Sequence, residues 1–558
     1  MLLDTEFRKA QKDSRELVVV VHGLSRTMLD HVPRCVAENM PTADVLIPKY
    51  SSGWLSNVDA VQLADELSGT IQSHYDRRER ETGKPYERVI LIGHSRGALF
   101  IRKAYVFASG QNHELWQGPL RPTPKAWARA VTRVVLLAGM HRGWSLSPKP
   151  PKMSWRRCLW LRSCDLMATL CRTARLMRAI KRGAPFVANL RVQWINLVRA
   201  DHPMPVTVQI LGNMDDLVSS SDNIDLQSGY NFIYLNAPPG TTHGGVADLS
   251  DPDRERVFLN ALLTPDELLK SEYAVPETQK PEPSVEQVVF IMHGIRDFGG
   301  WTQRLASTIT RQSQDQGRRV VTVTSSYGYF PMIKFLIFSE RQQNVRWFMD
   351  QFTEALAKYP KARPIDFAGH SNGTYLLASA LKRYRACAFG RAVFAGTVVP
   401  RGFEWNEMVD QGRVQAIRNY VATGDWVVGI FPRLFERMGD IGGAGLLGFE
   451  REPAANLEFH YVKGGHGAGI ATKNFESITA FLLDGGSRPP PPAITRSEQN
   501  RLVILLSKLY WLVWLILIGV IISAAWWVAF AWSPAFVPSP WLRVAIFILL
   551  LLAVLNSI

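Results

Sequence analysis

The chain has 558 residues, a formal net charge of +15 and 47% hydrophobic residues, which is enough apolar material for two domains of about 250 residues each. It has only five cysteines, an odd number, and this excludes an extracellular scaffold held by disulfides. The first twenty residues are charged and lack the apolar core of a signal peptide, so we expect the bulk of the chain on the cytoplasmic side.

Residues 1–270 are predicted to form a first domain in which short apolar runs alternate with helical stretches such as 60–75 and 99–107. The predicted strands are 18–21, 45–47, 89–92, 134–137, 206–211 and 232–235. Because these runs are nearly continuously apolar, they indicate an α/β fold with a mostly parallel sheet that helices cover on both faces. In such folds the ligand lies at the carboxyl ends of the strands.

A Gly-His-Ser-Arg-Gly sequence centred on Ser95 follows the third predicted strand and precedes a helical pattern. A strand, a sharp turn and a helix form the setting in which G-x-S-x-G presents a nucleophile, since glycine permits the tight turn. The stretch resembles the nucleophile elbow of the α/β-hydrolase superfamily. This resemblance implies that the Ser95 side chain stands at the carboxyl edge of the sheet and faces a base.

Candidates for the acid and the base follow the fifth and sixth predicted strands, where Asp215 and His243 stand. The order Ser95, Asp215, His243 is that of the superfamily. A serine hydroxyl needs a base to accept its proton, and the imidazole needs a carboxylate to hold its tautomer. Asp216 is the alternative acid, but Asp215 with Val218 matches the family pattern Asp-x-x-Val.

Other stretches extend the resemblance. The superfamily takes its oxyanion donors from the residue after the nucleophile and from the loop after the first strand, which implies the backbone amides of Arg96 and Leu24. Residues 138–143 are similar to the Thr-Pro-His-x-Gly turn of many lipases, with Met140 in place of the usual proline. Together with Asp-Asp-Leu-Val-Ser-Ser at 215–220, this half of the chain resembles the lipases related to the deacylases of glycosylphosphatidylinositol anchors.

A strongly basic insertion, 141–200, falls where the fold often places a cap. Between residues 141 and 182 it holds eleven Lys or Arg and one acid. From residue 159 onward it is predicted to be an amphipathic helix, preceded or begun by Trp155 and Trp160. Its apolar residues are Leu166, Leu170, Met177 and Ile180, and its basic residues are Arg172, Arg175, Arg178 and Arg182.

Such a basic helix with tryptophans suits the headgroup region of an anionic bilayer. One alternative is a cap helix that packs over the site while its arginines are merely solvated. Nucleic-acid binding is the least favoured hypothesis, because the insertion matches no recognisable nucleic-acid-binding motif.

The pattern restarts after a proline-containing linker at 271–284, and 285–485 is predicted to be a second domain of the same class. Its predicted strands are 288–292, 320–323, 365–368, 392–395, 417–422 and 457–462. A second Gly-His-Ser-x-Gly contains Ser371, and Asp425 and His466 follow the fifth and sixth strands. The resemblance implies Asn372 and Ile295 as the oxyanion donors of this copy.

The spacing of the motifs indicates an internal duplication. A strand ending in His-Gly lies upstream of each serine, with 73 residues from its histidine to Ser95 and 78 residues to Ser371. The serine and the acid are 120 residues apart in the first copy and 54 in the second, so the second has little room for a cap. We expect both copies to be active and favour the first if only one is.

A Pro-rich and basic linker at 486–508 precedes an apolar end, 509–558. The run 511–532 has twenty-two residues without a charge, enough to cross a hydrocarbon core of about 30 Å. The run 541–555 is apolar but shorter, and predicts either a second span, which makes a hairpin, or an interfacial helix. Four basic residues precede the first span and only Arg543 follows it, which favours a cytoplasmic location for the two domains.

These observations predict a membrane-anchored serine hydrolase that cleaves carboxylic esters, plausibly the acyl esters of lipids or phospholipids. No metal or organic cofactor is implied, and the sequence does not disclose the oligomeric state. Two alternatives stay open: a peptidase or thioesterase that acts on soluble substrates with the same triads, and a non-catalytic membrane scaffold built from hydrolase folds.

Overall fold

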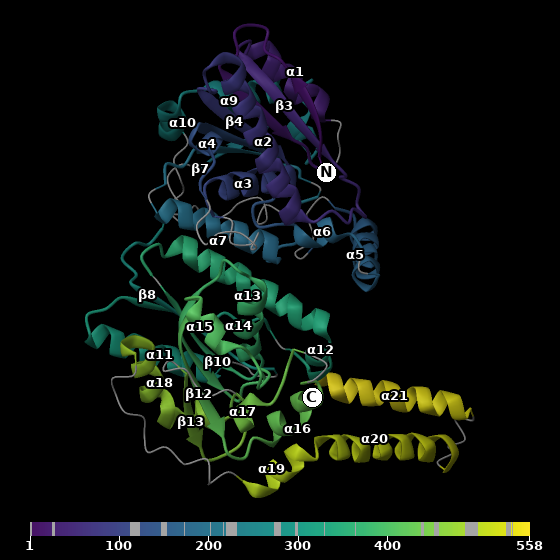
Figure 1. The fold of residues 1–558 in the computed structure, drawn as a ribbon. Coiled ribbons are helices and arrows are strands. Elements are labelled where there is room, and N and C mark those ends of the chain that lie inside the picture. The colour runs from purple at the N-terminus through teal and green to yellow at the C-terminus, as the bar shows by residue number, and fades with distance from the viewer. Residues whose placement is uncertain are drawn as a thin grey trace. The chain divides into compact units, whose positions relative to one another are not determined.

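The computed structural model describes most of the chain, which forms two compact units (Figure 1). The described residues are 3–24, 28–111, 123–146, 153–171, 173–200, 202–215, 217–218, 232–272, 281–295, 300–328, 330–362, 364–436, 440–450, 457–485, 500–531, 537 and 539–557. Unit 1 consists of Met1–Glu282, Met349–Pro360 and Tyr384–Ala386. Unit 2 consists of Pro283–Phe348, Lys361–Arg383 and Cys387–Ile558. Most of the two predicted linkers, at 273–280 and 486–499, lies outside the described residues.

Unit 1 is built on a seven-stranded sheet in the order β1-β3-β2-β4-β5-β6-β7. Its strands are β1 (Leu3–Arg8), β2 (Glu16–Val21), β3 (Ala43–Tyr50), β4 (Arg88–His94), β5 (Val131–Leu137), β6 (Val206–Leu211) and β7 (Phe232–Asn236). All neighbours are parallel except β1 and β3. Each predicted strand falls within one of β2 to β7. The sequence did not predict β1, because this edge strand is largely exposed and lacks an apolar run.

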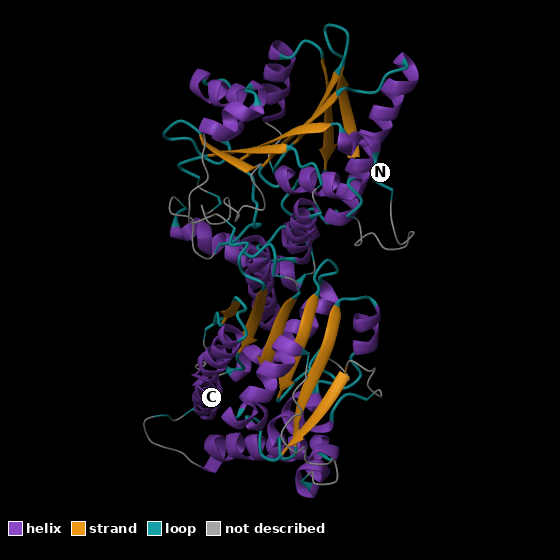
Figure 2. Cartoon of the chain, turned by 90° about the vertical axis from the view of Figure 1, so that its left-hand side faces the viewer, coloured by secondary structure: helices purple, strands orange, loops and turns teal. Residues whose placement is uncertain are grey.

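Helices cover both faces of this sheet (Figure 2). In β2, Val19 and Val21 belong to one buried cluster and Val18 and Val20 to another, because successive side chains of a strand point to opposite faces. The first cluster includes residues of α2 (Ala60–Thr82), α3 (Gly97–Ala108) and α7 (Pro185–Arg199), and the second includes residues of α1 (Met28–Asn39), α9 (Pro252–Leu263) and α10 (Asp266–Glu272). A strand that is buried on both sides must be apolar at every position, which explains the continuous runs.

The basic insertion forms several helices between β5 and β6, and the predicted single amphipathic helix is wrong. Helix α5 (Trp155–Leu170) and helix α6 (Arg175–Ala179) are separated at Ala174, whose φ of 53° is left-handed and cannot continue an α-helix. The expected apolar face is divided accordingly, since Leu166 is exposed whereas Met177 and Ile180 are buried. Arg172 lies outside the described residues.

Three arginines of the insertion pair with one buried carboxylate, Asp350, inside unit 1. The Asp350 carboxylate lies 2.5 Å from Nη2 of Arg142, 2.8 Å from Nη2 of Arg182 and 2.8 Å from Nη1 of Arg191. Burial alone would raise the pKa of Asp350, but the three guanidinium groups outweigh it and lower the pKa to about 2. Of these three arginines, Arg182 was assigned to the basic face of the predicted helix, and it is engaged in the interior instead.

Unit 2 contains a six-stranded parallel sheet in the order β13-β12-β11-β10-β8-β9. Its strands are β8 (Gln287–Met292), β9 (Val320–Val323), β10 (Ile365–His370), β11 (Phe389–Ala395), β12 (Val414–Ala422) and β13 (Leu457–Val462). The main helices are α11 (Gly300–Asp315), α13 (Phe338–Lys358), α14 (Asn372–Arg383), α16 (Trp426–Leu434), α17 (Ala444–Leu447) and α18 (Phe475–Asp484). The residues of α13 from Met349 onward belong to unit 1. Every predicted strand falls within one of these six. Their spatial order, starting from β9, repeats the order that starts from β3 in unit 1.

The C-terminal part of unit 2 is helical. It contains α19 (Arg501–Lys508), α20 (Tyr510–Trp526), which continues as a π-helix over Trp527–Ala531, and α21 (Pro540–Ser557). Within the described ranges, one helix, Tyr510–Ala531, is long and apolar enough to cross a membrane, judged by length and composition alone. The stretch Pro540–Val554 is apolar but shorter. Nη1 of Arg543 in α21 donates to the Ala529 carbonyl at 3.0 Å, so the second apolar helix is held to the end of the first.

Candidate active site

Ser95 stands on a strained turn between β4 and α3. Its φ is 55°, a left-handed conformation that costs a residue with a side chain about 1–3 kcal/mol. Its amide donates to the Leu137 carbonyl at 2.8 Å. The helix after the turn passes so close to β2 that a Cβ on Gly97 would lie 2.4 Å from the Val21 carbonyl oxygen. Only glycine fits there, which explains the final glycine of the motif.

Ser95, His243 and Asp215 form a hydrogen-bonded chain. Nε2 of His243 lies 2.8 Å from Oγ of Ser95, and Nδ1 of His243 lies 2.8 Å from Oδ2 of Asp215. The other carboxylate oxygen of Asp215 accepts from the amides of Leu217 and Val218 at 2.9 and 2.8 Å. An ionised Asp215 can only accept, so Nδ1 of His243 donates to it and Nε2 is left to accept the serine proton.

Burial keeps this chain away from solvent, since Ser95, His243 and Asp215 are all buried. Burial alone would raise the pKa of Asp215, but the hydrogen bonds from His243 and from the two amides outweigh it and keep the pKa below its ordinary value. The carboxylate is therefore charged at neutral pH and can stabilise a protonated imidazole. Asp216, the alternative acid, lies outside the described residues.

His94, the residue before Ser95, supports His243 and was missed by sequence reasoning. Its Nε2 donates to the backbone carbonyl of His243 at 3.2 Å. Burial, and secondarily the nearby His243, lowers the pKa of His94 to about 3, so its imidazole is neutral at neutral pH. The available signal was the histidine that precedes the serine in both elbows, since His370 donates in the same way to the His466 carbonyl at 3.2 Å.

The two proposed oxyanion donors of unit 1 come from the elbow itself and from the loop after β2. The amide of Arg96 is at the start of α3, where the first helical amides have no intrahelical acceptor. Leu24 lies on the loop after β2. This loop is held by His22, whose Nδ1 donates to the Gly23 carbonyl at 2.9 Å and whose own carbonyl accepts from Tyr50 Oη at 2.7 Å.

Unit 2 repeats these supports. Nδ1 of His293 donates to the Gly294 carbonyl at 2.8 Å, and Tyr327 Oη donates to the His293 carbonyl at 2.8 Å. Ile295 follows this loop, and Asn372 starts α14, so the two proposed donors occupy positions equivalent to Leu24 and Arg96. The Asn372 side chain donates to Tyr327 Oη at 3.1 Å.

The triad of unit 2 is only partly joined. Ser371 has a φ of 53°, as Ser95 does, and Nδ1 of His466 lies 2.9 Å from Oδ2 of Asp425. His466 and Ser371, both of which are described, form no hydrogen bond with each other. The side chain of His466 is 22% exposed, compared with 4% for His243. The structure therefore brings Asp425 and His466 together in unit 2 but leaves Ser371 unpaired with His466.

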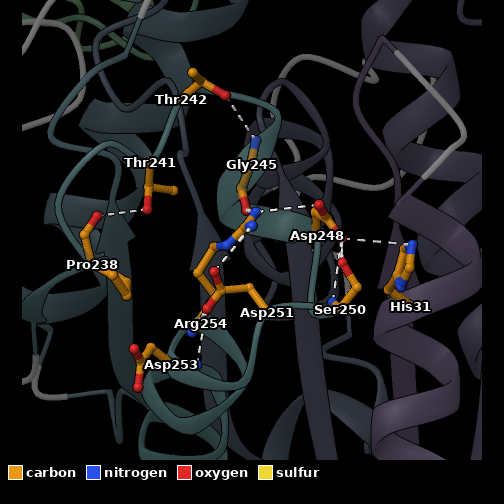
Figure 3. A network of polar contacts seen from close by, with 10 residues as sticks. All are labelled: His31, Pro238, Thr241, Thr242, Gly245, Asp248, Ser250, Asp251, Asp253 and Arg254. Carbon is orange, nitrogen blue, oxygen red and sulfur yellow. Dashed lines mark hydrogen bonds and ion pairs between the residues drawn. The ribbon is translucent and has the colours of Figure 1, made fainter.

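A polar groove of about 710 Å³ lies beside the loop that carries His243, and Figure 3 shows Thr242 and Gly245 of this loop, which are among the residues that line the groove. Thr242 and Gly244, the neighbours of His243, contribute to its lining. Arg254 holds the loop in place, because its Nη1 donates to the Gly245 carbonyl at 2.9 Å and lies 3.3 Å from Oδ2 of Asp248. In the part of the chain that the structure describes, no three His, Cys, Asp or Glu side chains are grouped to hold a metal ion.

The residues predicted to meet a membrane surface are divided between two helices. Trp155 and Trp160 are 66% and 62% exposed on α5. Arg175 on α6 is exposed, with its guanidinium 3.4 Å from the Asp59 carboxylate, and Arg178 is half-buried. The exposed face of α5 has its own arginines and apolar residues: Arg156, Arg157, Arg162, Leu159, Leu166 and Met167.

No protein-family model and no curated protein matches this sequence. Among solved structures, the chain is similar to a carboxylesterase of the thaumarchaeon Nitrososphaera gargenis, with 11% identity over 48% of this chain and 96% of that chain and a TM-score of 0.28. An esterase of Pyrobaculum calidifontis has 16% identity over 48% and 81%, with a TM-score of 0.30. A soluble variant of the monoglyceride lipase of Saccharomyces cerevisiae has 9% identity over 49% and 92%, with a TM-score of 0.32.

Proposed function

We propose that this chain is a serine hydrolase of carboxylic esters, with Ser95 as nucleophile, His243 as general base and Asp215 as the carboxylate that orients the base. The observation that carries the proposal is His243 itself, which lies 2.8 Å from both Ser95 Oγ and Asp215 Oδ2. This arrangement has the two contacts that nucleophilic catalysis by serine requires. The strained backbone of Ser95 adds support, because such strain gathers at reactive residues.

The proposed reaction has two halves. His243 removes the proton of Ser95 as Oγ attacks the acyl carbon, and the amides of Arg96 and Leu24 stabilise the oxyanion. The ester C–O bond breaks, the alcohol leaves with the proton from His243, and an acyl-serine forms. His243 then takes a proton from water, the hydroxide attacks the acyl-serine, and the acid is released while Ser95 regains its proton.

Ser371, His466 and Asp425 are proposed to form a second triad with the same chemistry. The Asp425–His466 bond and the Ser371 elbow support this proposal. His466 must move to accept the proton of Ser371, and its greater exposure leaves it room to do so. The first triad, whose contacts are already made, is proposed to carry the larger share of turnover.

Labelling of the full chain with a fluorophosphonate probe tests both sites, because the probe reacts only with an activated serine. The wild-type chain, Ser95→Ala, Ser371→Ala and the double variant are compared for labelling and for hydrolysis of a soluble short-chain ester. We expect Ser95→Ala to remove most of the turnover and the double variant to abolish labelling. A wild-type chain that does not label at either serine would rule out the enzymatic proposal and favour a scaffold. Turnover of peptides or thioesters without that of lipid esters would favour the peptidase or thioesterase.

The substrate is proposed to be a lipid or phospholipid acyl ester, with the chain anchored in the bilayer. Helix α20 and its π-helical extension support a span by length and composition, and α21 is proposed to complete a hairpin. The excess of basic residues before the span supports a cytoplasmic location for both units. We propose that anionic headgroups contact the exposed tryptophans and arginines of α5. The proposal also includes Arg172, Arg175 and Arg178, which follow α5 in the sequence.

A further inference from the structure

Helix α16 begins at the acid of the second triad. Asp425 is the N-cap residue of this helix, and its Oδ1 accepts from the Val428 amide at 3.1 Å while its Oδ2 holds His466 at 2.9 Å. One carboxylate therefore fixes both the start of α16 and the orientation of the base. Any displacement of α16 is transmitted directly to the second site.

The other end of α16 packs on the helices that lead into the proposed membrane span. Arg433 donates to the buried Ser507 hydroxyl of α19, and its guanidinium lies 5.6 Å from the ring centre of Tyr510, the first residue of α20. The amide of Asn500, the N-cap of α19, donates at 3.1 Å to the carbonyl of Thr423, two residues before Asp425. Contacts with α19 and α20 therefore occur both before Asp425 in the chain, at Thr423, and after it, at Arg433.

Three aromatic rings connect the residue after Asp425 with α20. Trp426, next to Asp425, is 53% exposed, and its ring centre lies 6.1 Å from that of Phe431. Phe431 packs edge-on against Trp514 of α20 at 5.6 Å, and Trp514 Nε1 donates to the Ile430 carbonyl at 3.3 Å. Tryptophan is the residue that best suits the boundary between hydrocarbon and water, because it has an apolar body and one polar N–H.

We propose that the second site receives an acyl ester directly from the bilayer that α20 spans, with the acyl chain sliding along Trp426, Phe431 and Trp514 to Ser371. This inference rests on the proposed hydrolase function of the second triad and on the proposed span. Trp514 contacts Phe431 and Phe431 contacts Trp426, the neighbour of Asp425. In this proposal the acyl chain follows these three rings, which limits the exposure of its apolar surface to water. A short soluble ester needs no such path and reaches His466, whose side chain is 22% exposed, from solvent.

The test uses the full chain carrying Ser95→Ala, reconstituted in vesicles of phosphatidylcholine and phosphatidylglycerol, so that only the second site turns over. Two substrates are compared: a fluorogenic phospholipid embedded in the vesicles and p-nitrophenyl butyrate in solution. Phe431→Ala and Trp514→Ala interrupt the aromatic surface from two different helices. Trp511→Ala is the matched control, because Trp511 is an exposed tryptophan of the same helix without a ring contact to α16 among the described residues.

We expect Phe431→Ala and Trp514→Ala each to lower turnover of the embedded phospholipid about tenfold and to leave the soluble ester within about twofold, with Trp511→Ala unchanged on both substrates. Equal losses on the two substrates, or no loss beyond that of Trp511→Ala, would overturn the inference while leaving the hydrolase intact. Fluorophosphonate labelling of Ser371 in the same vesicles separates a failure of the inference on lipid entry from a failure of the proposed hydrolase function. Without labelling, the proposed function of the second triad fails, and the inference fails with it.

Discussion

At the level of single residues, His94 explains how the backbone of His243, the proposed base of the first triad, is held in position. A histidine beside a catalytic serine invites a catalytic role, but a pKa near 3 keeps this imidazole neutral, and its Nε2 points to the His243 carbonyl. It is therefore a positioning residue. A hydrogen bond of this kind contributes about 1 kcal/mol, which is enough to change the population of a correctly placed base by several-fold.

Replacement of His94 tests this role. We expect His94→Leu to lower kcat for a short ester about tenfold with little change in KM, because leucine fills the space but cannot donate to the His243 carbonyl. His94→Gln keeps an N–H donor and should recover most of the loss. Steady-state kinetics of the Ser371→Ala background measure both variants. Equal defects in His94→Leu and His94→Gln would mean that packing, not donation, is what the site needs.

At the level of elements, the insertion shows what a pattern along the sequence can and cannot predict. The strands were predictable because burial on both faces demands unbroken apolar runs, and Ser95, Asp215 and His243 were predictable because each follows such a run. The break between α5 and α6 was not predictable, since an alanine in the sequence does not indicate the left-handed φ of 53° that Ala174 adopts. The pairing of Asp350 with three arginines could not be predicted either, because it joins residues that are more than 150 positions apart in the sequence.

Helix α5 is the element that we expect to meet lipid. In a full chain that carries Cys164→Ser and Cys171→Ser to remove the accessible native thiols, a bimane label on Leu159→Cys, a position that is 58% exposed, should be quenched by brominated phosphatidylglycerol in vesicles. Higher salt should reduce the quenching, because screening weakens the attraction of Arg156, Arg157 and Arg162 to the headgroups. The control is the same label on Leu268→Cys, 57% exposed on α10, which should not be quenched. Equal quenching at both positions would make α5 an ordinary solvated helix.

At the level of the whole molecule, Asp350 makes the stability of unit 1 depend on pH. The folded pKa of about 2 lies below the value of about 3.9 in an unfolded chain, so the carboxylate stabilises the folded state above pH 4. This contribution, about 2–3 kcal/mol, is lost as the pH falls from about 4 towards 2, since the unfolded chain takes up the proton first.

The pH dependence can be isolated with Asp350→Asn. This variant leaves buried Arg191 without its charged partner and should cost about 3–5 kcal/mol of unfolding free energy at pH 7. Thermal unfolding of the full chain in detergent micelles should show the difference from wild type shrinking as the pH is lowered through 4. Asp253→Asn, an exposed aspartate paired only at the surface, should change stability by less than about 1 kcal/mol. A pH-independent difference for Asp350→Asn would contradict the ionic explanation.

The left-handed backbone at Ser95 has a thermodynamic consequence that reaches beyond catalysis. Glycine adopts a φ of 55° without steric cost, whereas alanine retains the strain. Two chains that lack the Ser95 hydroxyl, Ser95→Gly and Ser95→Ala, should therefore differ in thermal stability, with the glycine chain melting about 2 °C or more higher. If the order is reversed, the turn is not strained. If the glycine chain is the more stable, the serine is retained at a cost in stability. Selection for thermal stability alone, without activity at this site, would then favour glycine at position 95.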